Sequence, residues 1–348
     1  MSTTTSKPFP FWKPILFFTI VVIGLYFVKW DPYYHKAFVA ADSHSIGNSI
    51  INDQYQTVWQ AMWQYSKVYF LAIWKAAVLG VLLGSLVQVL IPRDWLLRYL
   101  GSGRFGSILA GAVVSLPGMM CTCCAAPVAV GMRKASASVG SSVAFWMANP
   151  VLNPATLIFM GFVLGFEFSL IRLVAGVVMV LLTAYWVQRF SDNKSLDELG
   201  EQAKRLLQQR QDDSRHPFML WLTALWNLFL NTVPVYVITV LLLSAARVWL
   251  FPHADGIIGD SVVWLVFFAL VGTLFVIPTA AEIPIVQTLM LFGMGVGPAF
   301  ALLMTLPSVS LPSLLMMKPI LSLRSLITIG LCVTVTGIVT GLLAMAIL

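Results

Sequence analysis

The stretch that decides the fold is GSILAGAVVSLPGMMCTCCAAPVAVGM, residues 106–132. It contains no Lys, Arg, Asp or Glu, but Pro117 and Pro127 interrupt it. Proline removes a backbone donor and breaks a helix. Broken backbone is tolerated at membrane depth only where protein buries it or a cavity wets it. Because a cluster of three cysteines lies between the two prolines, we expect a thiol-bearing site on a permeation path.

The composition predicts a polytopic membrane protein. The chain has 348 residues, of which 59% are hydrophobic and 10% are charged, whereas a soluble domain carries about 25% charged residues. The net charge of +7 fits Lys and Arg retained in cytoplasmic loops and does not indicate a nucleic-acid partner. No phosphate-binding glycine loop is present, so we expect neither ATP-driven transport nor a soluble type of enzyme, and no cofactor.

Hydropathy divides the chain into membrane spans. A span needs about 20 apolar residues, and seven runs qualify: 14–30, 67–91, 137–165, 168–190, 217–250, 297–317 and 325–347. Two further runs, 106–131 and 262–292, contain proline. The predicted organisation is an N-terminal anchor span with an outer loop (1–66), a first membrane repeat (67–190), a charged cytoplasmic linker with a surface helix (191–216) and a second membrane repeat (217–348).

The basic residues predict two re-entrant hairpins. With the N-terminus in the cytoplasm, Arg133-Lys134 and the charged linker stay inside only if 106–131 enters and leaves on the same side. The same condition applies to 262–292, if Lys318 and Arg324 are to stay inside. We therefore expect an all-α protein with seven full spans and two proline-broken hairpins.

An internal repeat supports this plan. A shift of 157 residues aligns Pro127 with Pro284, Val139-Gly140 with Val296-Gly297, and Pro150 with Pro307. Each repeat then holds one hairpin and three spans, and an odd number of spans inverts the second repeat. Inverted repeats with broken helices that meet near the midplane recur among transporters.

The cysteines are the first candidate site residues. Cys121, Cys123 and Cys124 supply soft ligands for thiophilic species and weak S–H donors. The alternative is that they are small packing residues, which we expect for the isolated Cys332. Neither their spacing nor their surroundings predict a structural zinc site, because no His lies nearby.

Glu282 is the second candidate, beside the proline pair of the second hairpin. A carboxylate at membrane depth costs at least about 2.5–3.5 kcal/mol and is usually paired, wetted or functional. Glu282 is therefore interpreted either as a proton-coupling group or as the partner of Lys75, which lies mid-span.

Two asparagines complete the candidate site. Asn149 and Asn153 are four residues apart and share a helix face if the helix survives its prolines. Their amides are expected either to line the path or to cap freed carbonyls. Gly80 and Gly84 are expected to allow close packing.

Three motifs resemble those of a known family: SLPGMMCTCCAAP (115–127), FWMANPVLNP (145–154) and PTAAEIP (278–284). They are similar to the ArsP/YraQ-type predicted permeases of bacterial inner membranes, and the resemblance covers nearly the whole chain. It implies a multi-spanning permease. The better-characterised branch exports trivalent organoarsenicals, so the resemblance implies substrate contact for Cys121, Cys123 and Cys124.

The preferred hypothesis is an inner-membrane permease, a secondary transporter or facilitator, for a small thiophilic or sulfur-containing solute. Its midplane site would combine the Cys121–Cys124 loop with the Glu282 loop. One alternative is a membrane-embedded thiol oxidoreductase. A Cys-x-x-Cys pair at a helix start would favour it, but we expect no such pair in this chain. The other is a non-transporting scaffold subunit, which predicts no cavity at the proline loops. The expected partners are a solute and the lipid bilayer, while direction and oligomeric state stay open.

Overall fold

The computed structural model describes residues 12–46, 58–191, 217–250 and 259–348. Every regular element in these ranges is a helix, which confirms the predicted all-α class. Six helical stretches there are long and apolar enough to cross a membrane. The predicted surface helix of the linker lies outside the described residues.

The N-terminal span is longer than expected. It runs without a break through α1 (Trp12–Leu25), the π-helical turn η1 (Tyr26–Trp30) and α2 (Asp31–Ser43). The outer loop expected from residue 31 onward is therefore wrong for residues 31–43. Pro32 does not stop the helix, and it stands directly after the π-helical turn that joins α1 to α2. The next helix, α3 (Val58–Leu90), also begins earlier than predicted.

Residues 105–134 fold back on themselves after the short helix α4 (Arg93–Leu100). This first hairpin consists of α5 (Phe105–Ser115), the turn η2 (Leu116–Gly118) and α6 (Thr122–Lys134). Its two ends meet, because the carbonyl of Leu100 accepts hydrogen bonds from Ser138 N at 2.7 Å and Ser141 Oγ at 2.7 Å. This is the geometry expected of a re-entrant segment.

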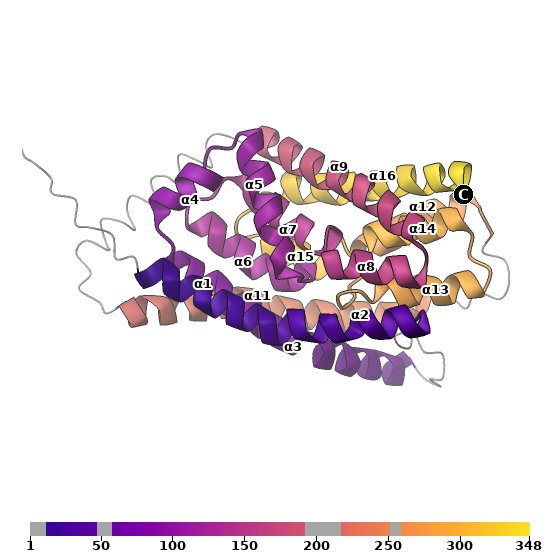
Figure 1. Cartoon of the computed structure of the whole chain (residues 1–348), viewed down its shortest axis with the longest axis horizontal. Coiled ribbons are helices and arrows are strands. Elements are labelled where there is room, and N and C mark those ends of the chain that lie inside the picture. Colours follow the sequence, from indigo (N-terminus) through magenta and orange to yellow (C-terminus); the bar gives the residue numbers. More distant parts are fainter. Residues whose placement is uncertain (1–11, 47–57, 192–216, 251–258) are drawn as a thin grey trace, which may run out of the picture.

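A second hairpin is built in the same way from α12 (Val262–Leu274) and α13 (Glu282–Leu291). Its ends also meet, since Gly297 N donates to Asp260 Oδ1 at 3.0 Å. Along the long axis of the molecule, α5 and α12 lie towards opposite ends (Figure 1). That placement suits an inverted repeat, which stays a prediction.

Two further segments are broken helices. The first consists of α7 (Val139–Val151) and α8 (Pro154–Val163), and the second of α14 (Val296–Thr305) and α15 (Leu311–Met317). The expected continuous span 297–317 is therefore wrong. Pro307 cannot donate to a helical ladder, and Ser310 starts α15 with a capping box. Asn153 caps α8 in the corresponding place.

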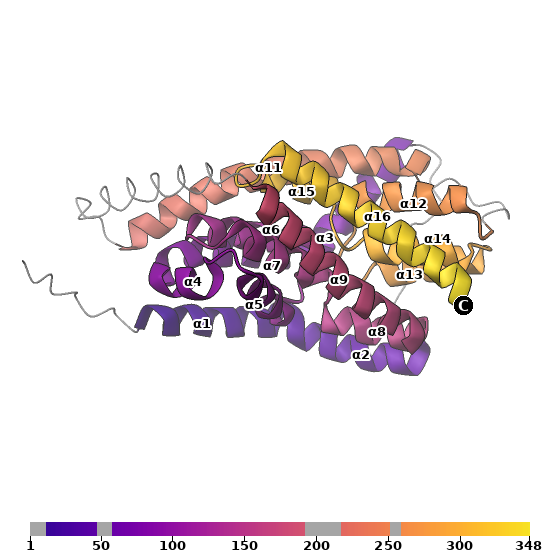
Figure 2. The ribbon, with the colours of Figure 1, turned by 90° about the horizontal axis from the view of Figure 1, so that it is seen from above.

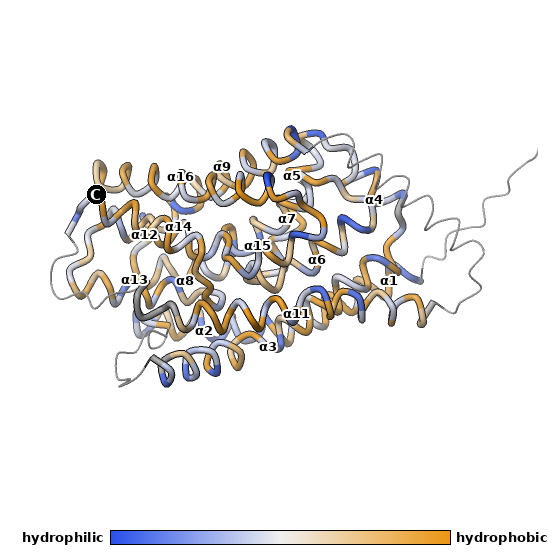
Figure 3. Tube along the Cα trace, turned by 180° about the vertical axis from the view of Figure 1, so that it is seen from behind, coloured by the Kyte–Doolittle hydropathy of each residue, from blue (hydrophilic) through white to orange (hydrophobic). Residues whose placement is uncertain are grey.

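The hairpins and broken helices form the core, and long helices surround them. These outer helices are α9 (Phe166–Phe190), α11 (Pro217–Leu250) and α16 (Leu323–Ile347). In the view from above, α9 and α16 pass in front of the shorter helices, and α11 runs along one edge (Figure 2). Their exposed side chains are largely Leu, Val, Ile and Phe, and hydrophobic colour runs along them in Figure 3. The chain is therefore a multi-pass membrane protein with its broken helices buried inside.

Candidate functional site

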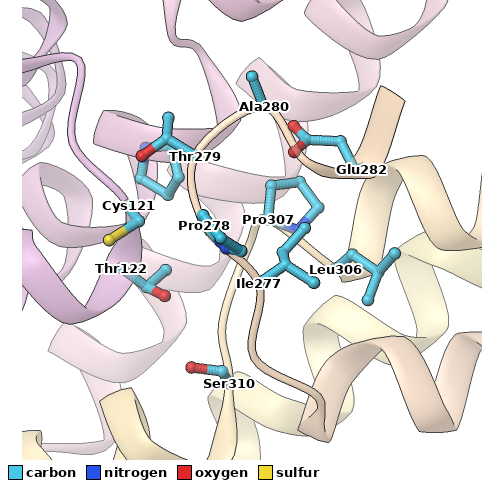
Figure 4. A pocket seen from close by; sticks show the side chains of 11 residues that line it. Cys121, Thr122, Ile277, Pro278, Thr279, Ala280, Glu282, Leu306, Pro307 and Ser310 are labelled. Atoms are coloured by element: carbon cyan, nitrogen blue, oxygen red, sulfur yellow. The ribbon is translucent and has the colours of Figure 1, made fainter. Parts of the chain in front are cut away.

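The tips of the two hairpins meet around a small cavity. The first tip is residues 116–121 and the second tip is residues 275–281. Figure 4 shows Cys121 and Thr122 on one ribbon and Ile277 to Glu282 on another. The cavity measures about 10 Å³ and is lined by Cys121, Thr122, Pro150, Ile277, Pro278, Thr279, Ala280, Glu282, Leu306, Pro307 and Ser310. That volume holds about one water molecule, so a larger solute enters only if the tips move apart.

Cys121 and Cys124 form a close pair. Their sulfur atoms lie 3.0 Å apart, and both side chains are buried. Cys121 is the N-cap residue of α6, so the pair has the Cys-x-x-Cys spacing at a helix start. The expectation that such a pair is missing is therefore wrong, because Cys121 and Cys124 have this spacing and α6 begins directly after Cys121.

Cys123 does not line the cavity that Cys121 lines. Its sulfur lies 3.7 Å from Ser310 Oγ and 4.0 Å from the hydroxyl of Tyr69. It also borders an apolar groove of about 470 Å³, lined mainly by side chains of α3 and α11. The three thiols thus divide between two environments, and only Cys121 contacts the cavity between the tips.

Glu282 is paired with Arg172 and not with Lys75. Arg172 Nη1 donates to Glu282 Oε1 at 2.9 Å, and both side chains are almost fully buried. Arg172 Nη2 also donates to the carbonyl of Pro150 at 3.2 Å. Lys75 is exposed on α3, with its Nζ 5.9 Å from the ring of Trp74. The expected Lys75 pairing is wrong, because Lys75 faces outward.

The second carboxylate oxygen of Glu282 has a different environment. Within the described residues, Oε2 is buried and lacks a hydrogen-bond partner. A buried acceptor without a partner is costly, and this one belongs to a residue that lines the cavity. It is therefore a place where a proton or a donor from a solute can bind.

Two residues of the N-terminal span reach the two tips. Lys29 Nζ lies 3.4 Å from Thr279 Oγ1 in the second tip and 3.2 Å from the hydroxyl of Tyr33. Trp30 Nε1 donates to the carbonyl of Pro117 in the first tip at 2.8 Å. Lys29 is only 6% exposed. The predicted anchor span is thus part of the site.

Asn149 and Asn153 hold the backbone around the site. Asn149 Oδ1 accepts a hydrogen bond from Met120 N at 2.8 Å, which fixes the first tip. Asn153 Oδ1 accepts from Ala155 N at 3.0 Å and so caps α8. Neither side chain lines the cavity. The structure therefore shows neither expected role: both side chains bind backbone N–H groups and not freed carbonyls, and within the described residues their Nδ2 atoms lack a hydrogen-bond partner.

Sequence reasoning missed Lys29 and Arg172. Both stand within predicted spans, Lys29 in 14–30 and Arg172 in 168–190. A census of every charge in the spans would have found them, because an intramembrane ionisable residue is a functional-site hypothesis by default.

The chain is similar to known proteins over nearly its whole length. The ArsP_1 family model, described as "Predicted permease", matches residues 69–346. The chain is 57% identical over 344 residues to the UPF0718 protein YraQ of Escherichia coli (strain K12), covering 99% of this chain and 98% of the relative. It is 22% identical over 333 residues to the UPF0718 protein MJ0584 of Methanocaldococcus jannaschii, covering 77% and 91%. No solved structure matches the chain.

Proposed function

Because the chain belongs to the ArsP_1 family of predicted permeases, we propose that it carries a small thiophilic or sulfur-containing solute across the bacterial inner membrane. It acts as a secondary transporter or facilitator. The observation that carries this proposal is the cavity between the hairpin tips, which Cys121 lines from one side and Glu282 from the other. The soft thiol supplies affinity for a thiophilic atom.

The closed cavity implies that the tips move during transport. A space for about one water molecule excludes a solute of several heavy atoms in this state. Access from each side then alternates as the tips separate, which suits a fold with broken helices at mid-depth. In this proposal, Glu282 Oε2, which has no hydrogen-bond partner in the described residues, is the position at which a proton couples to transport. The proposed orientation has the N-terminus in the cytoplasm.

A transport assay with cysteine variants tests the proposal. The purified chain is reconstituted into proteoliposomes, and uptake of phenylarsine oxide and of hydrosulfide is compared with that of empty liposomes. We expect Cys121→Ser to abolish uptake of the accepted probe, and Cys332→Ser, the matched control outside the site, to leave it unchanged. Full uptake by a chain with Cys121, Cys123 and Cys124 all replaced by Ser would contradict the proposal.

The Cys121–Cys124 pair favours a second candidate, a membrane-embedded thiol oxidoreductase. Thiols 3.0 Å apart at a helix start suit a redox pair. The pair would give two electrons and two protons to a disulfide-bearing substrate, forming its own disulfide bond. Mass spectrometry after incubation with oxidised glutathione tests this candidate. A loss of two hydrogens between Cys121 and Cys124, reversed by dithiothreitol and absent in Cys124→Ser, would support it, whereas permanently reduced thiols would exclude it.

A further inference from the structure

Lys29 is a buried cation for which the described residues provide no acidic partner. Its side chain is 6% exposed, and its Nζ donates to the hydroxyl oxygens of Tyr33 and Thr279. The nearest acid along its own helix, Asp31, is exposed and lies 3.6 Å from His35. A charge held at this depth is expensive unless something compensates it.

The other charges near the tips cancel. Arg172 and Glu282 form a buried pair of zero net charge, so Lys29 is the buried cation at the described part of the site that has no carboxylate partner. Only the hydroxyl group of Thr279 separates the Lys29 ammonium group from the cavity, because Thr279 accepts a hydrogen bond from Lys29 and also lines the cavity.

The backbone around the cavity adds to the positive potential. Helix α6 starts directly after Cys121, and helix α13 starts at Glu282. Both residues line the cavity, so the N-terminal ends of two helices approach it. Each such end carries a partial positive charge from its free N–H groups. The charge of Lys29 and the two helix N-termini therefore all make the electrostatic potential in the cavity more positive.

We propose that Lys29 determines specificity, and that the solute of this permease is a small anion with a soft, thiophilic centre. This inference rests on the function proposed above. Cys121 contacts the soft centre, while Lys29, acting beside Thr279, compensates the negative charge. Binding of the anion then removes the uncompensated charge from the site.

The local backbone around Lys29 also suits a site. In η1 the helix widens to a π-helical turn, a feature that is frequent at functional sites. The N-terminal span precedes the residues matched by the family model, 69–346, and it brings the charge of Lys29 to the second tip.

Charged thiol reagents test the proposal without a known solute. In a Cys332→Ser background, the rate at which the remaining thiols are modified is measured with two methanethiosulfonate reagents. One carries an anionic sulfonatoethyl group and the other a cationic trimethylammonioethyl group. We expect Lys29→Gln to lower the ratio of anionic to cationic rate about tenfold, because one charge acts oppositely on the two reagents. Lys29→Arg keeps the charge and should keep the ratio. Lys75→Gln is the matched control for an exposed lysine and should not change it.

Three results would overturn the proposal. An unchanged ratio in Lys29→Gln would show that its charge does not act on an entering solute. An equal fall of both rates would show that Lys29 acts on the thiols alone. No reaction of the parent chain with either reagent would show that no aqueous path reaches the site. If instead the cysteine-free chain transports normally while the ratio responds to Lys29, the thiol role fails and the charge role stands.

Discussion

The two hairpins share a plan but differ in how firmly the protein holds them. Each closes at its ends, and each tip has one non-glycine residue with left-handed backbone, Met119 (φ 47°) and Ala280 (φ 69°). However, 12 of the 13 residues of α6 are buried, against 5 of the 10 residues of α13. Helix α6, which carries the thiols, is enclosed by protein, whereas the outer part of α13 is not.

The packing of α3 explains the difference. A Cβ on Gly80 would lie 2.2 Å from the carbonyl oxygen of Cys124, and one on Gly131 would lie 2.1 Å from that of Gly84. Helices α3 and α6 therefore touch backbone to backbone, as expected for these glycines. From this contrast we infer that the thiol-bearing hairpin is the fixed wall of the site and that the hairpin bearing Glu282 moves.

The largest expected loss of stability follows from breaking the Arg172–Glu282 ion pair, which holds the second hairpin. Arg172→Met leaves Glu282 buried and alone, and removing one partner of a buried pair costs about 3–5 kcal/mol. Thermal unfolding in detergent should show a clear loss of stability. The double variant Arg172→Met with Glu282→Met should regain most of it without regaining transport. Equal stability of the single variant and the parent would contradict a holding role for the pair.

A smaller effect is expected from separating the first hairpin from α3. Gly131→Ala places a methyl group against the backbone of Gly84, and overpacking of this kind costs about 1–3 kcal/mol. Thermal unfolding measures the loss, and modification of Cys121 should become faster as α6 shifts. The control is Gly330→Ala on α16, where an added Cβ meets nothing within 4 Å. If both variants behave alike, the contact does not fix the hairpin.

Relief of strain at the second tip should have a modest effect of the opposite sign. Ala280 holds a left-handed conformation, which costs a non-glycine residue roughly 1–2 kcal/mol. Ala280→Gly should raise the unfolding temperature or leave it unchanged, and it should alter the transport rate, because glycine frees the moving tip. The same change at Met119 in the fixed tip should leave transport closer to that of the parent. An identical effect at both tips would argue against one moving hairpin.

The smallest effect is expected at Lys75. Its side chain is exposed and away from both tips, and surface substitutions usually change stability by less than about 0.5 kcal/mol. Lys75→Met should therefore preserve both unfolding temperature and uptake. A large loss of uptake would mean that α3 contributes a charge to transport that the closed state does not reveal.

Local signals in the sequence predicted much of the fold but not the charge partners. The prolines and the basic residues predicted both folded-back segments, and the repeat drew attention to Pro150 and Pro307. The partner of Glu282 could not be predicted in this way, because Arg172 is 110 positions distant in the chain and only tertiary packing joins them. The contact of Lys29 with Thr279 could not be predicted for the same reason, because the two residues are 250 positions apart in the chain.

The tight contact between the tips has a consequence for the energy supply of the cell. A bacterial membrane stores work as an ion gradient, and a permanent water-filled hole through a protein would discharge it. Because the cavity between the tips has space for only about one water molecule, no wide aqueous channel opens there in this state. Each passage then requires a structural cycle, so throughput follows the speed of that cycle and not free diffusion.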